Sequence, residues 1–199
     1  GLSVRREKAV MMFTGDIMCA VKHQRLASGH QHDYFDSFRR VRDILSGADF
    51  TAGVLETTSI DRAPFEFEQL RLLTGAPNCN SPSTFISAVA AAGFNAVVTA
   101  NNHNSDCGVE GLKAVDSEIR RCGMLNIGSM GHSLVMTDVK GIKVAVIATT
   151  MITNNTGWDL SKSGLVNPAG IYSRDYFTEL VNSARRMGAE FIAAYQHWG

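Results

Sequence analysis

The sequence lacks a charge excess, a long apolar run and a paired cysteine motif. Its 199 residues include 19 Lys or Arg and 19 Asp or Glu, so the net charge at pH 7 is zero. Without a basic surplus, we expect no nucleic-acid binding. No segment approaches the ~20 apolar residues of a membrane span, and none resembles a signal peptide. The chain as given is therefore expected in the cytoplasm, or in the cell envelope if an export signal or anchor was removed.

Cysteines are few and unpaired in sequence. The chain contains Cys19, Cys79, Cys107 and Cys122, with no CxxC spacing. A chain of this length buries roughly 70% of its unfolded surface and needs no disulfide framework. We expect the thiols to be reduced and incidental.

Short apolar runs alternate with helical patterns along the chain. The apolar runs predict strands over 9–18, 49–58, 95–102 and 190–199, and a hairpin over 134–150 that turns at Lys140-Gly141. Helical spacing predicts helices over 34–48, 81–94, 108–123 and 173–189, with Ser81, followed by Pro82, and Ser173 as N-caps. This alternation predicts one α/β domain, residues 1–199, with a largely parallel sheet.

Polar residues stand at the ends of four predicted strands. In open α/β sheets, ligands bind outside the carboxyl ends of the strands. Oxygen and imidazole donors gathered there suit a divalent cation such as Mn²⁺, Fe²⁺ or Zn²⁺, and two cations ~3.5–4 Å apart can activate a bridging water. We therefore expect the side chains at these strand ends to converge on one metal site: Asp16, Glu56, Asn102 and His197. His103, directly after Asn102, is a candidate general acid or oxyanion donor.

Each residue also has a structural explanation. Asp16 fits an Asx turn, Glu56 an exposed strand end, and the Asn101-Asn102 pair a turn. His103 alone fits an ordinary loop histidine, and His197 a packed corner beside Trp198. A second histidine group, His23, His30 and His32, lies in a polar loop where metal binding is disfavoured.

The motifs "GDIM", "LE", "ANNHNSDCGVEGL" and "HWG" occur in the order seen in the CapA family. This family of bacterial capsule, or poly-γ-glutamate, synthesis proteins is similar to the calcineurin-like metallophosphoesterases. The resemblance runs from about Val10 to Gly199. It implies a sandwich of two β-sheets flanked by helices, a two-metal site, and a metal-dependent hydrolase acting on a phosphoester or on an amide of an anionic polymer.

The resemblance also assigns roles to single residues. It makes Asp16, Glu56, Asn102 and His197 metal ligands and His103 the catalytic histidine. Asp106 either orients His103 or caps the following helix. Met18 stands where other members of the superfamily have a histidine ligand. That departure supports an alternative, a non-catalytic binding or assembly component of a polymer-synthesis machine.

The family continues beyond the "HWG" motif with more sheet and a late His-rich motif. We therefore expect the chain to be truncated at its C-terminus, to lack part of the second sheet, and to bind metal weakly. An unpaired sheet edge would favour self-association. A Ser-esterase is disfavoured, because Ile17 stands where the Gly-Asp-Ser nucleophile would be.

Overall fold

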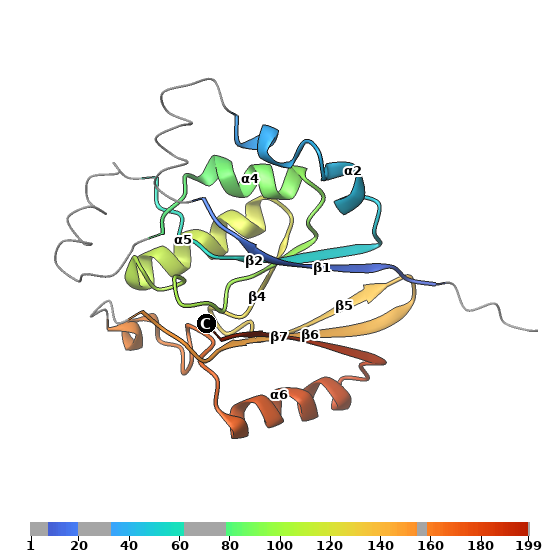
Figure 1. Cartoon of the computed structure of the whole chain (residues 1–199). Coiled ribbons are helices and arrows are strands. Elements are labelled where there is room, and N and C mark those ends of the chain that lie inside the picture. The colour runs from blue at the N-terminus through green and yellow to red at the C-terminus, as the bar shows by residue number, and fades with distance from the viewer. Residues whose placement is uncertain (1–7, 20–32, 62–78, 155–158, 199) are drawn as a thin grey trace, which may run out of the picture.

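The computed structural model describes residues 8–19, 33–61, 79–154 and 159–198. Two β-sheets face each other, with helices outside both (Figure 1). The first sheet is wholly parallel, in the order β1 (Met11–Ile17), β2 (Phe50–Leu55), β3 (Ala96–Val98), β4 (Leu125–Ile127). The second contains β5 (Leu134–Val139), β6 (Ile142–Thr150) and β7 (Phe191–His197), with β6 antiparallel to β5 and parallel to β7. This confirms the predicted α/β sandwich of two sheets flanked by helices.

Helices cover the outer face of each sheet. In Figure 1, α2 (Arg42–Leu45), α4 (Ser83–Ala91) and α5 (Gly108–Arg121) lie on the outer side of the first sheet, and α6 (Arg174–Arg186) lies on that of the second. Two short 3-10 helices, Tyr34–Phe38 and Leu160–Ser163, complete the described elements. Three apolar cores result: one between the sheets, and one between each sheet and its helices. Every residue of β2 is buried, as expected for a parallel strand covered on both faces.

Several local signals predicted the observed elements. Lys140 and Gly141 have φ values of 52° and 76°, the left-handed conformations that a tight hairpin turn requires. The Ser173 side chain accepts a hydrogen bond from the backbone N–H of Tyr176 and so caps α6. At α4 the cap is Pro82 rather than Ser81. The backbone N–H of Ser83, the first helical residue, is instead bound by Asp61.

The helix predicted over 34–48 is confirmed only in part, because the range does not form one continuous helix. The segment forms a 3-10 turn and the short α2, and the periodic residues Phe35 and Ile44 are exposed. Phe38 packs against Phe85 and Phe94, with ring centroids 6.4 and 6.3 Å apart. Asp33 also caps the 3-10 turn by accepting from the Phe35 N–H. The sequence analysis also missed β4, whose three residues are too few to show a period.

Tyr195 links the two sheets. Its hydroxyl on β7 donates to the backbone carbonyls of Ala52 and Thr14, at 2.9 and 3.2 Å, and its ring contacts Phe13. This contact holds the last part of β7 against the middle of β1 and β2. Among the described residues, the helices are all too short or too polar to cross a membrane.

We expect Tyr195→Phe to lower the free energy of unfolding by about 1 kcal/mol, because the ring stays packed while the inter-sheet hydrogen bond is lost. For a domain of this size that is a fall of roughly 2–4 °C in Tm. Thermal denaturation beside Tyr172→Phe, on the outer side near α6, measures the difference. Equal Tm values for the two variants would show that the hydroxyl does not join the sheets.

Candidate functional site

A cleft of about 480 Å³ opens at the carboxyl ends of the strands. Asp16 lies near the end of β1, Glu56 directly follows β2, and Asn102 lies four residues after β3. His197 is the last residue of β7. All four side chains line this cleft, so the structure brings together the residues predicted as metal ligands.

Asn102 and His197 are in direct contact within the cleft. The Asn102 Oδ1 and His197 Nε2 atoms are 2.9 Å apart, and His197 Nδ1 lies 3.9 Å from the Asp16 carboxylate. Asp16 is about half exposed, whereas the His197 side chain is 14% exposed. A neutral amide, an imidazole and a carboxylate therefore meet at one wall that solvent can reach.

The charges in the cleft favour a cation. Burial raises the pKa of Glu56, and the nearby carboxyl of Asp16 raises it further. Burial lowers the pKa of His197, although Asp16 opposes this shift. None of the described residues that line the cleft is Lys or Arg. Two neighbouring carboxylates, beside imidazole and amide donors, form a set that fits a borderline divalent cation such as Mn²⁺, Fe²⁺ or Zn²⁺.

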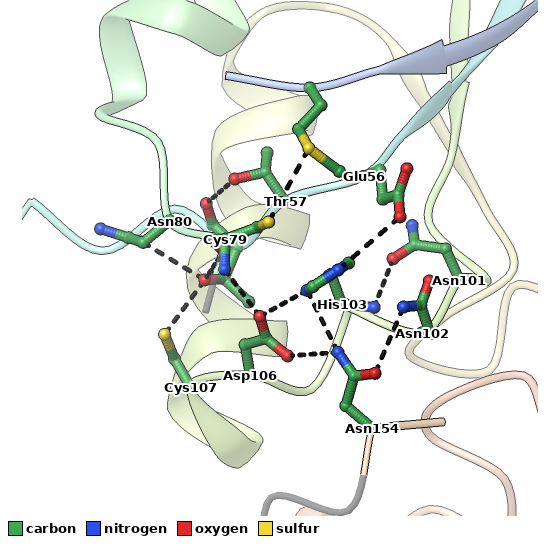
Figure 2. Close-up of polar contacts among 12 residues, drawn as sticks. Glu56, Thr57, Cys79, Asn80, Asn101, Asn102, His103, Asp106, Cys107 and Asn154 are labelled. Atoms are coloured by element: carbon green, nitrogen blue, oxygen red, sulfur yellow. Dashed lines mark hydrogen bonds and ion pairs between the residues drawn. The ribbon is translucent and has the colours of Figure 1, made fainter. Parts of the chain in front are cut away.

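His103 and Asp106 form a buried pair beside the cleft (Figure 2). His103 Nδ1 lies 2.7 Å from Asp106 Oδ2, which also accepts the backbone N–H of Cys79. The N-cap position of α5 is Cys107, without a side-chain cap. Asp106 therefore orients His103 and does not cap the helix. The other ring nitrogen, Nε2, is directed toward Glu56, 3.8 Å away.

The environment of His103 changes its proton affinity. Burial would lower its pKa, but hydrogen bonds with Asp106 and Cys79 outweigh burial and raise the pKa to about 10.

The loop that carries Asn102 and His103 is held by Asn101, which is fully buried. Its amide donates to the Leu55 carbonyl and its oxygen accepts the His103 N–H. Asn101 therefore fixes the loop that carries Asn102 and His103 to the end of β2.

Cys79, His103 and Asp106 form a second group able to hold a metal ion. One ligating atom from each lies within 4.8 Å of the others, and all three residues are buried. The sequence analysis treated Cys79 as incidental, because a cysteine far from any motif carries no signal. Asp106 Oδ2 already takes two hydrogen bonds in this group. A cation there would have to displace at least one of them.

Asn154 is a further site residue that the sequence analysis missed. It lies four residues after β6, on the loop that reaches the His103–Asp106 pair. Like Asn102, Asn154 follows the carboxyl end of a strand, so the rule that predicted Asn102 as a site residue could also have predicted Asn154.

His132 lies away from the cleft, beside Asp116 and Arg120. The group of His23, His30 and His32 lies outside the described residues.

Cys107 is predicted to be unreactive in the folded chain. Burial raises its pKa to about 12 from an ordinary 9.0, although a hydrogen bond with Thr58 lowers it. Because the folded pKa lies above the unfolded one, this thiol stabilises the fold fully below pH 9.0 and loses that effect as pH rises toward 12. Iodoacetamide at pH 9 should label Cys107 rapidly only after unfolding, by peptide mass mapping. Equal labelling rates in the folded and unfolded chain would contradict this.

Comparison with known proteins finds capsule synthesis proteins. The profile of the bacterial capsule synthesis protein family PGA_cap matches residues 10–199. The chain is 23% identical over 210 residues to "Capsule biosynthesis protein CapA" of Bacillus anthracis, covering 97% of this chain and 47% of that protein. It is 30% identical over 118 residues to the Sinorhizobium fredii proteins y4sH and y4uA, covering 59% of this chain and 24% of theirs. The chain thus spans about half of one relative and a quarter of the others.

Two solved structures are distantly similar. NAD nucleotidase (NadN) of Haemophilus influenzae matches 84% of this chain and 28% of its own, with a TM-score of 0.43 and 15% identity. A hypothetical protein of Thermus thermophilus matches 94% of this chain and 57% of its own, again with a TM-score of 0.43 and 15% identity. Likenesses this distant say nothing about activity.

Proposed function

Because the chain belongs to the bacterial capsule synthesis protein family PGA_cap, we propose that it is a metal-dependent hydrolase of capsule or poly-γ-glutamate synthesis. Its substrate would be a phosphoester or an amide bond of an anionic polymer. One observation carries the proposal: donors from four strand ends line a single cleft, and a buried histidine–aspartate pair adjoins it.

Four side chains would hold the metal: Asp16, Glu56, Asn102 and His197. The carboxylates supply charge, and the amide and imidazole add donors without adding further negative charge. A divalent cation held there would lower the pKa of a bound water and stabilise an oxyanion. Only two of the four donors are anionic, so the described residues alone support one cation better than two.

His103 is the residue placed to move a proton. Asp106 holds the ring through Nδ1, which leaves Nε2 facing Glu56 at the cleft side. A histidine held in this way can protonate a leaving group or donate a hydrogen bond to an oxyanion. Asp106 supports this role by fixing the ring, since its oxygen already binds both His103 and the Cys79 N–H.

Substrate binding would depend on the metal. The described cleft residues include two carboxylates and no Lys or Arg. An anionic polymer or phosphoester would meet repulsion there until a cation is bound. Binding of an anionic substrate should therefore require the metal, and a chelator should abolish substrate binding as well as turnover.

One observation favours the alternative, a non-catalytic binding or assembly component. Met18 offers a thioether where the superfamily resemblance places a histidine ligand. Its sulfur lies 3.9 Å from Cys79 Sγ. Loss of one ligand would weaken metal binding without removing the polymer-binding cleft.

The two functions separate in one set of assays. The chain is loaded with Mn²⁺ and tested on bis(p-nitrophenyl) phosphate and on poly-γ-glutamate, beside Glu56→Gln and the exposed control Asp175→Asn. A hydrolase predicts turnover in the parent chain and in Asp175→Asn, lost in Glu56→Gln and on adding chelator. Polymer binding without turnover of either substrate would support the non-catalytic alternative. A chain that takes up no metal at this cleft contradicts the proposed hydrolase.

A further inference from the structure

Asn154 lies between the proposed metal ligand Asn102 and the His103–Asp106 pair (Figure 2). Its backbone N–H donates to the Asn102 carbonyl at 3.2 Å. Its side-chain nitrogen lies 3.2 Å from His103 Nδ1 and 3.4 Å from Asp106 Oδ1. Its side-chain oxygen lies 3.2 Å from the Asn102 nitrogen. One side chain thus contacts every member of this group.

The orientation of the Asn154 amide follows from the chemistry of its neighbours. The carboxylate of Asp106 accepts the Cys79 N–H and lies against the His103 ring, and the nitrogen of Asn154, the only donor of its amide, faces the other carboxylate oxygen. The Asn154 oxygen then faces Asn102, and only the nitrogen of Asn102 can donate to it. The assignment of oxygen and nitrogen in both amides therefore rests on this hydrogen-bond network.

The consequence appears at the cleft. With its nitrogen bound to Asn154, Asn102 turns its Oδ1 toward His197 Nε2, 2.9 Å away. Only the oxygen of an amide can bind a divalent cation, because its nitrogen has no available lone pair. A free Asn102 could rotate its amide and present the wrong atom to the cleft.

We propose that Asn154 is a positioning residue. Its amide nitrogen faces the Asp106 carboxylate, its amide oxygen accepts a hydrogen bond from the nitrogen of Asn102, and the oxygen of Asn102 is thereby directed toward the metal. The inference rests on the proposed role of Asn102 as a ligand. It adds a coupling between parts of the site: the carboxylate that orients His103 also sets the orientation of a ligand. Mutation of a residue that hydrogen-bonds to a metal ligand typically lowers metal affinity ~10–100-fold.

The experiment measures metal affinity and amide orientation in the same variants. Asn154→Leu keeps approximate side-chain size and removes the polar side-chain contacts with Asn102, His103 and Asp106. Asn154→Ala is a second variant in case the leucine does not pack. Thr153→Ala, at the adjacent exposed position, is the matched control. Mn²⁺ affinity is measured by calorimetric titration, the ligand set by the absorption spectrum of bound Co²⁺, and folding by Tm.

We expect both Asn154 variants to lose about 10–100-fold in Mn²⁺ affinity and to change the Co²⁺ spectrum, with Thr153→Ala unchanged. A merely structural role would lower Tm and leave the Co²⁺ spectrum of the folded protein as it was. Parent-like affinity and spectrum in a folded Asn154 variant would overturn the inference.

A readout without metal separates this inference from the proposed function. In the metal-free chain, the side-chain amide protons of Asn102 should be protected from exchange by Asn154 and lose that protection in Asn154→Leu. If the parent chain binds no metal but this protection depends on Asn154, the proposed function fails and the positioning stands. If the protection is the same in the parent and the variant, the positioning fails whatever the metal result.

Discussion

We expect His103→Ala to lower kcat of the Mn²⁺-loaded chain toward a phosphodiester by about 10²–10⁴-fold, the usual contribution of a general acid or base. His103 is 6% exposed, its Nε2 is directed toward Glu56, which lines the cleft, and its Nδ1 is occupied by Asp106. It lies beside the four proposed ligands and is not one of them. Metal affinity should therefore change little, and the loss should fall on turnover.

The measurement pairs steady-state kinetics at saturating Mn²⁺ with a metal titration of the same sample. His132→Ala, which removes a histidine outside the cleft that contacts Asp116 and Arg120, is the matched control. An unchanged kcat in His103→Ala would exclude His103 from the mechanism. A large loss of metal affinity in that variant would instead place His103 among the ligands, as the group of Cys79, His103 and Asp106 allows.

Asp106→Ala should destabilise the chain strongly. Asp106 is fully buried, and its carboxylate binds the His103 ring, the Cys79 N–H and the Asn154 amide. Removing one partner of a buried charged pair costs about 3–5 kcal/mol, because the remaining groups lose their hydrogen bonds without regaining water. In a domain of this size, that corresponds to a fall of roughly 6–20 °C in Tm.

Chemical denaturation of the metal-free chain measures this cost without any contribution from bound metal. Asp36→Ala, an exposed acidic residue of the first 3-10 helix, is the control and should stay within about 0.5 kcal/mol of the parent. A loss below about 1 kcal/mol in Asp106→Ala would mean that the pair is not a buried structural unit. The proposed orientation of His103 would then lack its support.

The strand ends were the most predictable part of the site. Asp16, Glu56, Asn102 and His197 are far apart in sequence, yet each follows an apolar run that reads as a strand. Parallel strands of one sheet place their carboxyl ends at one edge, so the sequence could predict that Asp16, Glu56 and Asn102 converge. His197 reaches the same cleft from β7 of the second sheet. The structure places all four on one cleft.

The side-chain contacts behind the cleft could not be predicted in the same way. Asp106 fitted a helix cap as well as a partner for His103, since both need an acid just before α5. Only the fold, which brings the Cys79 backbone N–H to the same oxygen, distinguishes the two. Cys79 contacts the pair from a segment with no recognisable motif. Asn154 follows a strand end, as Asn102 does, but only the tertiary structure shows that it reaches the pair.

The helical spacing of apolar residues did not predict the structure correctly where tertiary packing favoured another conformation. Over residues 34–48 the apolar spacing is helical, but Phe38 packs on Phe85 and Phe94, and the chain turns after it. Ile44 is left 62% exposed as a result. The strand β4 is too short to show alternation, and it forms because its neighbour β3 offers a parallel edge.

The central claim is that the cleft formed by Asp16, Glu56, Asn102 and His197 binds a divalent cation. Anomalous diffraction from crystals of the chain soaked in Mn²⁺ tests it most directly, because the manganese signal locates the cation without reference to activity. The account predicts an anomalous peak within about 2.5 Å of donor atoms from at least three of these four residues, at bond lengths typical of such cations. A peak at Cys79, His103 and Asp106 instead, or no peak at the cleft, would contradict it.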